Sequence, residues 1–329
     1  MKSNISIAMA TYNGSKYLRE QLDSVYSQSL LPYEVCVVDD CSTDDTVTIL
    51  TEYQKKYGLK YVVNKQHLGV NQNFEKALLM TTGEYIMFCD QDDYWLPNKN
   101  ECMMNIMQKI VQHDKACIVT CRNTYCDENL IPYRKPTPLE IHLKADTMDY
   151  RDTIINHLSQ GAAMLINRKA LDYILPFPKN SNICYDYYIG YIVALLGIKY
   201  DMKASLIKYR IHENNVTNAF RNVSKQKYST FKLNRIKNKL KQYHNVSIVP
   251  EHSIRVFKLV NDKLEYKIDN KKLNYINRVI LLSDKNLSFF KRLYLLCSTP
   301  KVPMIRKWHS MKAHILNYLF VNKYHNEIF

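Results

Sequence analysis

The chain has 329 residues and a formal net charge of +15, with 46% hydrophobic and 23% charged residues. These proportions are ordinary for a globular protein with a sizeable core. No apolar run approaches the ~18–20 residues that a membrane-spanning helix needs, which argues against a protein that crosses the membrane. The nine cysteines follow no secretory signal, so we expect reduced thiols in the cytoplasm rather than a disulfide framework.

The first 115 residues alternate strand-like and helix-like patterns, as a parallel α/β sheet requires. Strand patterns occur at 5–10, 33–40, 59–64, 85–89 and 116–121. Helical periodicity follows these strands at 15–28, 47–53 and 71–81 and after Pro97. A looser segment, 122–160, precedes a predicted strand at 160–171, a predicted helix at 183–200 and a closing segment at 206–218.

Polar residues gather where the predicted strands end. They are Thr11, Tyr12 and Asn13 after the first strand, Asp39 and Asp40 after the second, and Asp90, Asp92 and Asp93 after the fourth. In open parallel sheets, ligands bind in the crevice beyond the carboxyl ends of the strands. This edge of the sheet is therefore the candidate active site.

The three acids at 90–93 repel one another unless something positive lies between them. Clustered carboxylates at a strand end commonly hold Mg²⁺ or Mn²⁺, which in turn bridge to a substrate diphosphate. The alternative is a solvated acidic loop, or an acid that caps the helix after Pro97. Glycine-rich phosphate loops are absent, which argues against a nicotinamide enzyme and a P-loop ATPase.

Four segments in order, "SIAMATYNGSKYLREQLDSVYSQ", "VVDDCSTDDT", "GEYIMFCDQDDYWLPNK" and "YRIHENN", resemble the family 2 glycosyltransferases. More narrowly, they resemble the rhamnosyltransferase-like members that build bacterial surface polysaccharides. The resemblance is dense over 3–100, thinner to about 218 and absent beyond. It implies the GT-A type of α/β fold: a mostly parallel central sheet flanked by helices, here with a basic helical C-terminal extension.

The resemblance also implies roles for single residues. The nucleotide-sugar-binding residues would be Thr11, Tyr12, Asn13, Asp39, Asp40, Gly69, Asn73, Asp90, Gln91 and Arg210. The family's DxD-type motif falls on Asp90, Gln91 and Asp92, and the metal ligands would be Asp90, Asp92 and His212. Asp186 would be the catalytic base that takes the proton of the acceptor hydroxyl.

Each role has a structural alternative. Asp186 precedes an apolar run and could instead cap a helix, and His212 could be a structural histidine. Gly161 lies where the family places its acceptor-side strand, or it is a position of tight packing. Cys41 stands where the family usually has glycine, and its β-carbon could shift the Asp40 loop. Tyr185 stands where relatives often have His or Glu, which bears on the polarity of the acceptor site.

The C-terminal third is strongly basic. Residues 221–329 hold 23 lysines and arginines but six acids, a net charge of +17, which leaves −2 on residues 1–220. We expect a GT-A domain at 1–220, with a nucleotide-sugar-binding half at 1–115 and an acceptor half at 116–220, followed by a basic, mainly helical region at 221–329. The segment 289–320 reads as an amphipathic helix on anionic lipid, or as a helical face packed on the body.

These features together predict an inverting, metal-dependent glycosyltransferase with Mn²⁺ or Mg²⁺ as cofactor. Expected donors are dTDP-rhamnose, UDP-glucose or UDP-galactose, and the expected acceptor is a glycan on a polyprenyl diphosphate in O-antigen or related synthesis. The enzyme would be cytoplasmic and peripheral at the inner face of the cell membrane. One alternative is a non-catalytic nucleotide-sugar or carbohydrate-binding protein of the same fold. Another, a nucleic-acid binder, lacks any recognisable nucleic-acid module.

Overall fold

The computed structural model describes residues 4–133, 146–151, 153, 160–179, 183–213, 215, 256, 259, 268–282, 291 and 294–295. Backbone contacts divide the chain into two units, Met1–Asn218 and Ala219–Phe329. The second unit contains helix α12 (Asn270–Leu282). The predicted membrane-surface helix at 289–320 lies outside the described residues, apart from three positions. Within the described part of the chain, no helix is long and apolar enough to cross a membrane.

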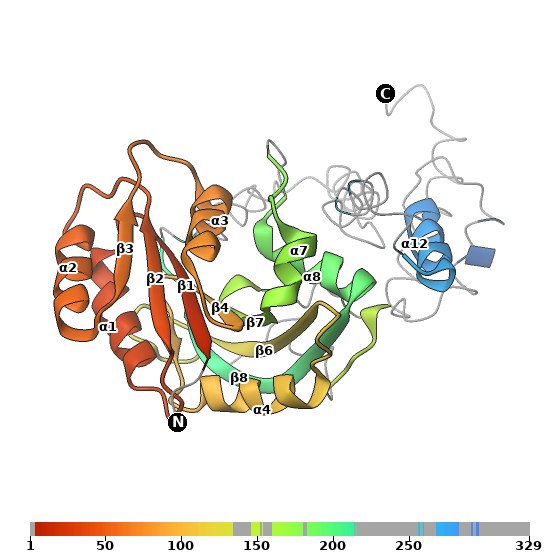
Figure 1. Cartoon of the computed structure of the whole chain (residues 1–329), viewed down its shortest axis with the longest axis horizontal. Helices are drawn as coiled ribbons and strands as arrows, with labels where there is room; N and C mark the ends of the chain where they lie inside the picture. The colour runs from red at the N-terminus through yellow and green to blue at the C-terminus, as the bar shows by residue number, and fades with distance from the viewer. Residues whose placement is uncertain are drawn as a thin grey trace, which may run out of the picture. The chain divides into compact units, whose positions relative to one another are not determined.

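The first unit is built on a sheet whose eight described strands run in the order β3-β2-β1-β4-β7-β6-β8-β5 (Figure 1). The strands are β1 (Ile5–Thr11), β2 (Glu34–Asp39), β3 (Lys60–Val63), β4 (Tyr85–Cys89), β5 (Tyr94–Trp95), β6 (Cys117–Cys126), β7 (Met164–Asn167) and β8 (Ile198–Arg210). The pairs β1–β2, β1–β4, β2–β3 and β6–β8 are parallel, whereas β7 is antiparallel to both of its neighbours and β5 is antiparallel to β8.

Helices cover both faces of this sheet (Figure 1). They are α1 (Ser15–Tyr26), α2 (Thr46–Tyr57), α3 (Val70–Met80), α4 (Lys99–Ile110), α7 (Leu171–Ile174) and α8 (Tyr185–Leu196), with short 3₁₀ turns η1 (Gly161–Ala163) and η2 (Arg168–Ala170). The side chains of α1, α2 and α4 join one core cluster with alternate residues of β1, such as Ile7 and Met9. Helices α3, α7 and α8 lie on the other face.

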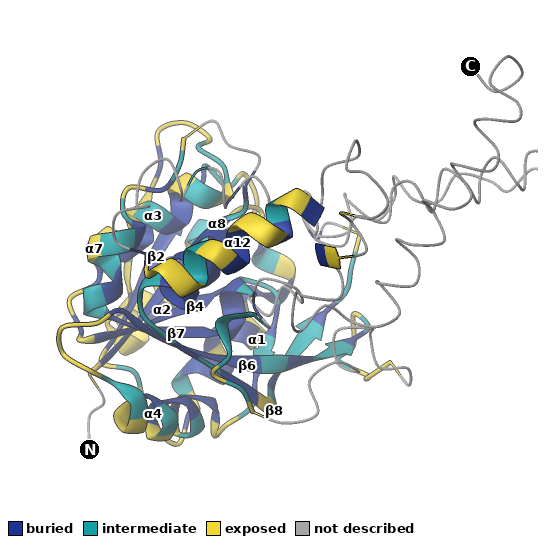
Figure 2. Ribbon diagram, turned by 90° about the vertical axis from the view of Figure 1, so that its right-hand side faces the viewer, coloured by how far each residue is buried: buried dark blue, intermediate teal, exposed yellow. Residues whose placement is uncertain are grey.

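The central strands are buried on both faces, as Figure 2 shows. All six residues of β2 are buried, and β4 is buried over its whole length. Near-continuous burial is expected of parallel strands with helices on either side. The predicted α/β class with a mostly parallel sheet is therefore confirmed. All eight described cysteines are free, which agrees with the expectation of reduced thiols.

Two predicted elements have wrong boundaries. Of the strand predicted at 160–171, only Met164–Asn167 is a strand (β7), and it lies between the 3₁₀ turns η1 and η2. The helix predicted at 183–200 ends at Leu196, and β8 begins at Ile198, where it pairs with Cys117 of β6. A β-carbon on Gly197 would lie 2.1 Å from the Ala116 carbonyl oxygen. The chain therefore passes so close to the neighbouring backbone that only glycine fits, and the helix stops there.

Candidate functional site

The candidate site lies at the carboxyl edge of the three neighbouring strands β2, β1 and β4. Thr11 at the end of β1 is in register with Asp39 at the end of β2, and Asp90 follows directly on β4. Because the three strands are parallel, their polar end residues meet at one edge of the sheet. The expected convergence of these strand ends is thus present in the structure.

Asp39 supports this edge from beneath. Its side chain is fully buried and accepts hydrogen bonds from the Thr11 hydroxyl at 2.8 Å, the Ser42 main-chain N–H at 2.9 Å and the Ser42 hydroxyl at 2.6 Å. These contacts tie the loop after β2 to the end of β1. Contact of Thr11 or Asp39 with a nucleotide stays a prediction, because both side chains face into the protein.

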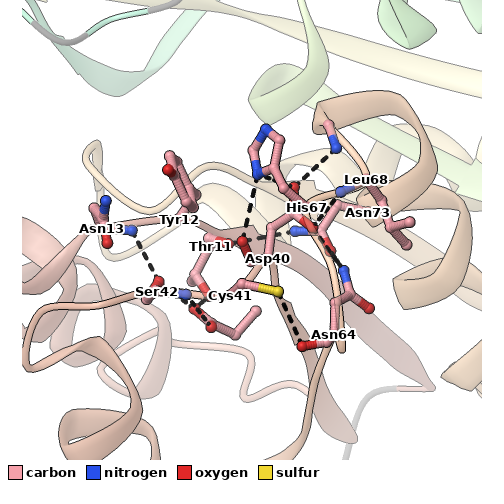
Figure 3. A network of polar contacts seen from close by, with 12 residues as sticks. Thr11, Tyr12, Asn13, Asp40, Cys41, Ser42, Asn64, His67, Leu68 and Asn73 are labelled. Carbon is pink, nitrogen blue, oxygen red and sulfur yellow. Dashed lines mark hydrogen bonds and ion pairs between the residues drawn. The ribbon is translucent and has the colours of Figure 1, made fainter.

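The carboxylate of Asp40 accepts three hydrogen bonds and also lies against the His67 ring, which Figure 3 shows as one network. Oδ1 receives the Asn64 side-chain amide and the Leu68 N–H, both at 2.8 Å. Oδ2 receives the Gly69 N–H at 2.8 Å and lies 2.9 Å from Nδ1 of His67. Gly69 has φ +82° and is the N-cap of α3, so the negative charge lies at the positive end of a helix.

Asn73 anchors the same network to the sheet. Its side-chain amide donates to the Val38 carbonyl at 2.8 Å, and its Oδ1 accepts from Asn64 at 3.0 Å. Lys76 in turn donates to the Asn64 side-chain oxygen at 2.6 Å. Asn73 is 2% exposed, so it supports the Asp40 loop from within the protein. A contact between Asn73 and the nucleotide sugar stays a prediction.

Cys41 occupies the position where glycine was expected, and it adopts the backbone conformation that glycine favours. Its φ is +65°, a strained value for a residue with a β-carbon. The thiol lies 3.0 Å from the Asn64 carbonyl oxygen, which is a weak hydrogen bond within the same network. The loop therefore keeps Asp40 in contact with its four partners in spite of the side chain at position 41.

Tyr12 and Asn13 are the exposed members of this edge. The Tyr12 ring is 48% exposed and its centroid lies 4.7 Å from that of His67. The Asn13 N–H donates to the Ser42 hydroxyl at 2.8 Å, and the Asn13 side-chain oxygen accepts from the Thr43 N–H at 2.9 Å. The loops after β1 and β2 are therefore fastened to each other, which leaves the Tyr12 ring facing outward.

The acid segment borders a cavity of about 470 Å³. Its lining residues are Tyr12, Asn13, Gly14, Lys16, Tyr17, Gln91, Asp92, Glu128, His212 and Glu213. Within it, Nε2 of His212 lies 2.8 Å from Oδ2 of Asp92, so the end of β8 brings the late histidine to the acid after β4. The two residues that the family resemblance assigns to the metal thus lie in contact, and their role as metal ligands stays a prediction.

Of the other acids in the segment, Asp93 is buried and Asp90 is half-buried. Burial, together with the charges of Asp92 and Asp186, raises the pKa of Asp90 to about 8. Burial and the charges of Asp92 and Asp90 also raise the pKa of Asp93, whose Oδ2 has no hydrogen-bond partner among the described residues. The helix after Pro97 is capped by Asn98 instead, so neither Asp92 nor Asp93 serves as its N-cap.

The donor set fits a divalent cation in part. Across the described residues, no three His, Cys, Asp or Glu side chains converge on one point, so the grouping of Asp90, Asp92 and His212 stays a prediction. Asp92 and His212 do form a pair of an oxygen and a nitrogen ligand on the cavity wall. A nearby cation would also relieve the mutual repulsion that raises the Asp90 pKa.

Arg210 holds the acid segment against β8. Its guanidinium is 2% exposed, donates to the Asp92 carbonyl at 2.9 Å, and contacts the carboxylate of Glu20 and the carbonyl of Glu128. It also lies 4.4 Å from the centre of the Tyr17 ring, a cation–π distance. Its contact with donor phosphates stays a prediction, because these partners already engage the guanidinium.

Asp186 lies in the first turn of α8, where Cys184 is the N-cap, so the capping alternative does not describe it. Its carboxylate accepts the N–H of Tyr187 at 2.7 Å and that of Gly161 at 3.3 Å. Burial raises its pKa although these hydrogen bonds oppose the shift. Because its charge contributes to the raised pKa of Asp90, the two carboxyl groups are electrostatically coupled.

Gly161 is a position of tight packing. A β-carbon there would lie 1.7 Å from the Tyr185 hydroxyl oxygen. The Tyr185 ring is held by Phe74 at 4.3 Å and Phe88 at 5.6 Å between ring centroids. Glycine at 161 therefore allows the 3₁₀ turn η1, which leads into β7, to approach the helix that carries Asp186.

Several residues at the site escaped the sequence interpretation. They are Lys16, Tyr17, Asn64, His67, Glu128 and Glu213. His67 lies in the loop that follows β3, so the same reasoning about strand ends would have found it. Glu128 belongs to a loop after β6 whose return to the site depends on the fold and has no local signal.

Comparisons with known proteins agree with one another. Residues 6–175 match the family model described as glycosyl transferase family 2. The chain is 28% identical over 247 residues to the dTDP-rhamnosyl transferase RfbG of Shigella flexneri, which covers 70% of this chain and 80% of RfbG. It is 27% identical over 223 residues to the putative teichuronic acid biosynthesis glycosyltransferase TuaG of Bacillus subtilis, at 66% and 82% coverage.

The fold is similar to that of residues 1–349 of S. aureus TarS, crystallised in complex with UDP-GlcNAc. The TM-score is 0.57 at 20% identity, and the match covers 95% of this chain and 79% of the TarS chain. This likeness confirms the GT-A type of fold. The chain spans 66%, 69% and 27% of the length of three further curated relatives.

Proposed function

Because the chain belongs to glycosyl transferase family 2, we propose that it is an inverting, metal-dependent glycosyltransferase that moves a sugar from a nucleotide donor to a glycan hydroxyl. The pairing of Asp92 with His212 on the wall of the cavity is the observation that supports this most. A binding protein would have no need of the half-buried Asp186 carboxylate, whose charge acts on Asp90.

The donor would lie along the carboxyl edge of the sheet. The nucleobase would lie against Tyr12 and Asp40, bordered by Asn13, Gly69 and Asn73. The diphosphate would lie at Gln91 and Asp92, toward Arg210. Asp92 and His212, with Asp90 beside them, would hold Mn²⁺ or Mg²⁺. Such a cation supplies positive charge that stabilises the departing diphosphate.

Asp186 would act as the general base. The acceptor hydroxyl oxygen would form a bond to the anomeric carbon while the bond from that carbon to the diphosphate oxygen breaks on the opposite face. The hydroxyl proton would pass to the Asp186 carboxylate, and the attack from behind inverts the anomeric centre. The N–H groups of Gly161 and Tyr187, at 3.3 and 2.7 Å, would hold the carboxylate in orientation.

The substrate classes follow from similarity and charge. The name of RfbG favours dTDP-rhamnose as donor, whereas the ligand of TarS favours a UDP-sugar such as UDP-glucose or UDP-galactose. The name of TuaG favours a surface polysaccharide as product, for which the acceptor would be a lipid-linked glycan. The net charge of +17 on residues 221–329 would hold the enzyme at the anionic inner face of the cell membrane.

The test is turnover of a panel of donors. Purified protein with Mn²⁺ or with EDTA would be incubated with dTDP-rhamnose, UDP-glucose and UDP-galactose, and the release of nucleoside diphosphate followed. We expect slow, Mn²⁺-dependent release from one donor, which Asp186→Asn reduces by about 10²-fold or more because the base is lost. Absence of release from every donor, or release that Asp186→Asn leaves unchanged, would contradict the proposal.

A further inference from the structure

The four donors around Asp40 differ in how firmly they are fixed. A carboxylate offers about four acceptor positions, and at Asp40 three hydrogen bonds and the His67 ring lie around them. The N–H groups of Leu68 and Gly69 belong to the main chain at the start of α3. The Asn64 side chain is 6% exposed and is held from two other sides, by Asn73 and Lys76. These three donors can leave only if the loop itself moves.

His67 is the exception. Its side chain is 58% exposed, whereas that of Asp40 is 3% exposed. Nδ1 of His67 lies 2.9 Å from Oδ2 of Asp40 and 3.4 Å from the main-chain carbonyl oxygen of the same residue. Both oxygens only accept hydrogen bonds, so Nδ1 must carry the hydrogen. Rotation about the His67 side-chain bonds would free Oδ2 on this side and leave the hydrogen bonds from Asn64, Leu68 and Gly69 intact.

The imidazole also covers the ring of Tyr12. The two ring centroids are 4.7 Å apart and the planes are tilted by 53°, so the rings touch without parallel stacking. Figure 3 shows the His67 ring next to Asp40, with dashed lines that join the two residues. A planar group that donates one ring N–H to Asp40 and lies on Tyr12 would occupy the position that His67 now holds.

We propose that His67 is a displaceable cap on Asp40, and that the nucleobase of the donor binds by replacing it. The inference rests on the proposed function, because it requires the base to bind at Asp40. His67 then sets the selectivity for the nucleobase, because its departure frees one acceptor position on Oδ2 of Asp40 for the incoming base.

That single position selects the chemical class of the base. Uracil and thymine present one ring N–H, at N3, between two carbonyl groups. Guanine presents two adjacent donors, N1–H and N2–H, and would need a second acceptor position that Leu68, Gly69 and Asn64 already fill. Cytosine has an acceptor at N3 in place of an N–H, so its ring nitrogen would face the Asp40 carboxylate unfavourably, and its N4 amino group could donate there only from a shifted position. The site therefore fits a uridine or thymidine diphosphate.

The experiment compares UDP with CDP by calorimetry in the presence of Mn²⁺, because the two ligands share every phosphate contact and differ in the base. We expect His67→Ala to bind UDP about three- to tenfold more tightly than wild type, since the base no longer has to break one hydrogen bond. The affinity for CDP should change by less than about twofold on the same scale. Gln66→Ala, an exposed neighbour in the same loop, should leave both affinities unchanged.

A measurement on wild-type protein makes the result independent of the variant's folding. NMR of the histidine ring nitrogens should show Nδ1 of His67 hydrogen-bonded in the free protein and released when UDP saturates the site. Unchanged or weaker UDP binding by His67→Ala, or an Nδ1 signal that UDP does not alter, would overturn the inference and leave the proposed function standing. Failure of wild type to bind either UDP or dTDP in the presence of Mn²⁺ would overturn both.

Discussion

Gln91 and Tyr12 are joined by two opposed hydrogen bonds across the site. The side-chain oxygen of Gln91 accepts the Tyr12 N–H at 2.8 Å, and its amide donates to the Tyr12 carbonyl at 3.0 Å. The acid segment after β4 is therefore held in register with the end of β1. Gly14 makes the contact possible, because a β-carbon there would lie 2.2 Å from the Gln91 side-chain oxygen.

Gly14→Ala should displace the Gln91 side chain without unfolding the protein, because a long side chain can rotate away. We expect Gly14→Ala and Gln91→Ala each to weaken UDP binding by about three- to tenfold, the value of one or two net hydrogen bonds. The double variant should be no weaker than either single variant, since both remove the same contact. Calorimetry of the three variants checks this, and additive losses would show that the two residues act separately.

As the pH is lowered, the rate of transfer should decrease at a higher pH than it would if the base were an aspartate with an ordinary pKa. Burial raises the pKa of Asp186, and the ionised form is the active base, so activity is lost as the pH falls through that raised value. A hydrogen bond from the Cys184 thiol opposes the shift. Cys184→Ala should therefore move the acid limb of the kcat profile to still higher pH, and an unmoved limb would argue against Asp186 as the base.

Gly161→Ala should destabilise the protein by about 1–3 kcal/mol, the usual cost of overpacking. The new methyl group would meet the Tyr185 hydroxyl at 1.7 Å, and the aromatic ring is wedged by Phe74 and Phe88. Tyr185→Phe in the same chain removes the nearest atom and should recover part of the loss. Urea denaturation of the two single variants and the double variant measures this; a fully stable Gly161→Ala would contradict the packing account.

Glu34 gives a prediction for stability alone. Burial would raise its pKa, but hydrogen bonds from Lys60, Ser6 and Thr82 outweigh burial and lower it to about 2. Because the folded-state pKa lies below the ordinary value, the stabilisation is complete above about pH 5 and is lost as the pH falls toward 2. Glu34→Gln should cost about 2 kcal/mol at pH 7 and much less near pH 2. A difference that does not vary with pH would exclude this carboxylate as its source.

Local patterns predicted the first half of the fold well. β4 begins and ends where its apolar run predicts, and the helices after β1, β2 and β3 follow their periodicity within a few residues. The acids, Tyr12 and Asn13 could be assigned to one edge because parallel strands must end together. The pairing of His212 with Asp92 was reached through the family resemblance, since nothing local joins residues 120 positions apart.

The remainder depends on tertiary contacts that short patterns do not contain. Residues 198–200, predicted as the end of a helix, belong to β8 because the chain at Gly197 lies against the Ala116 backbone. The family resemblance assigns Asp39 and Arg210 to nucleotide-sugar binding, yet both side chains are buried and hold loops together. The partners of the Asp40 carboxylate all come from residues 64–69, the loop between β3 and α3, which no local pattern joins to the end of β2. Only the assembled structure reveals that His67 lies against Oδ2 of Asp40.

The most direct test of the account is whether Asp92 couples the metal to the nucleotide. UDP would be titrated by calorimetry into wild type, Asp92→Ala and the exposed-acid control Asp114→Ala, each with Mn²⁺ and with EDTA. We predict that Mn²⁺ strengthens UDP binding to wild type and Asp114→Ala by about tenfold or more, and that Asp92→Ala loses this gain while it stays folded. Equal UDP affinity with and without Mn²⁺ in wild type, or an undiminished gain in Asp92→Ala, would contradict it.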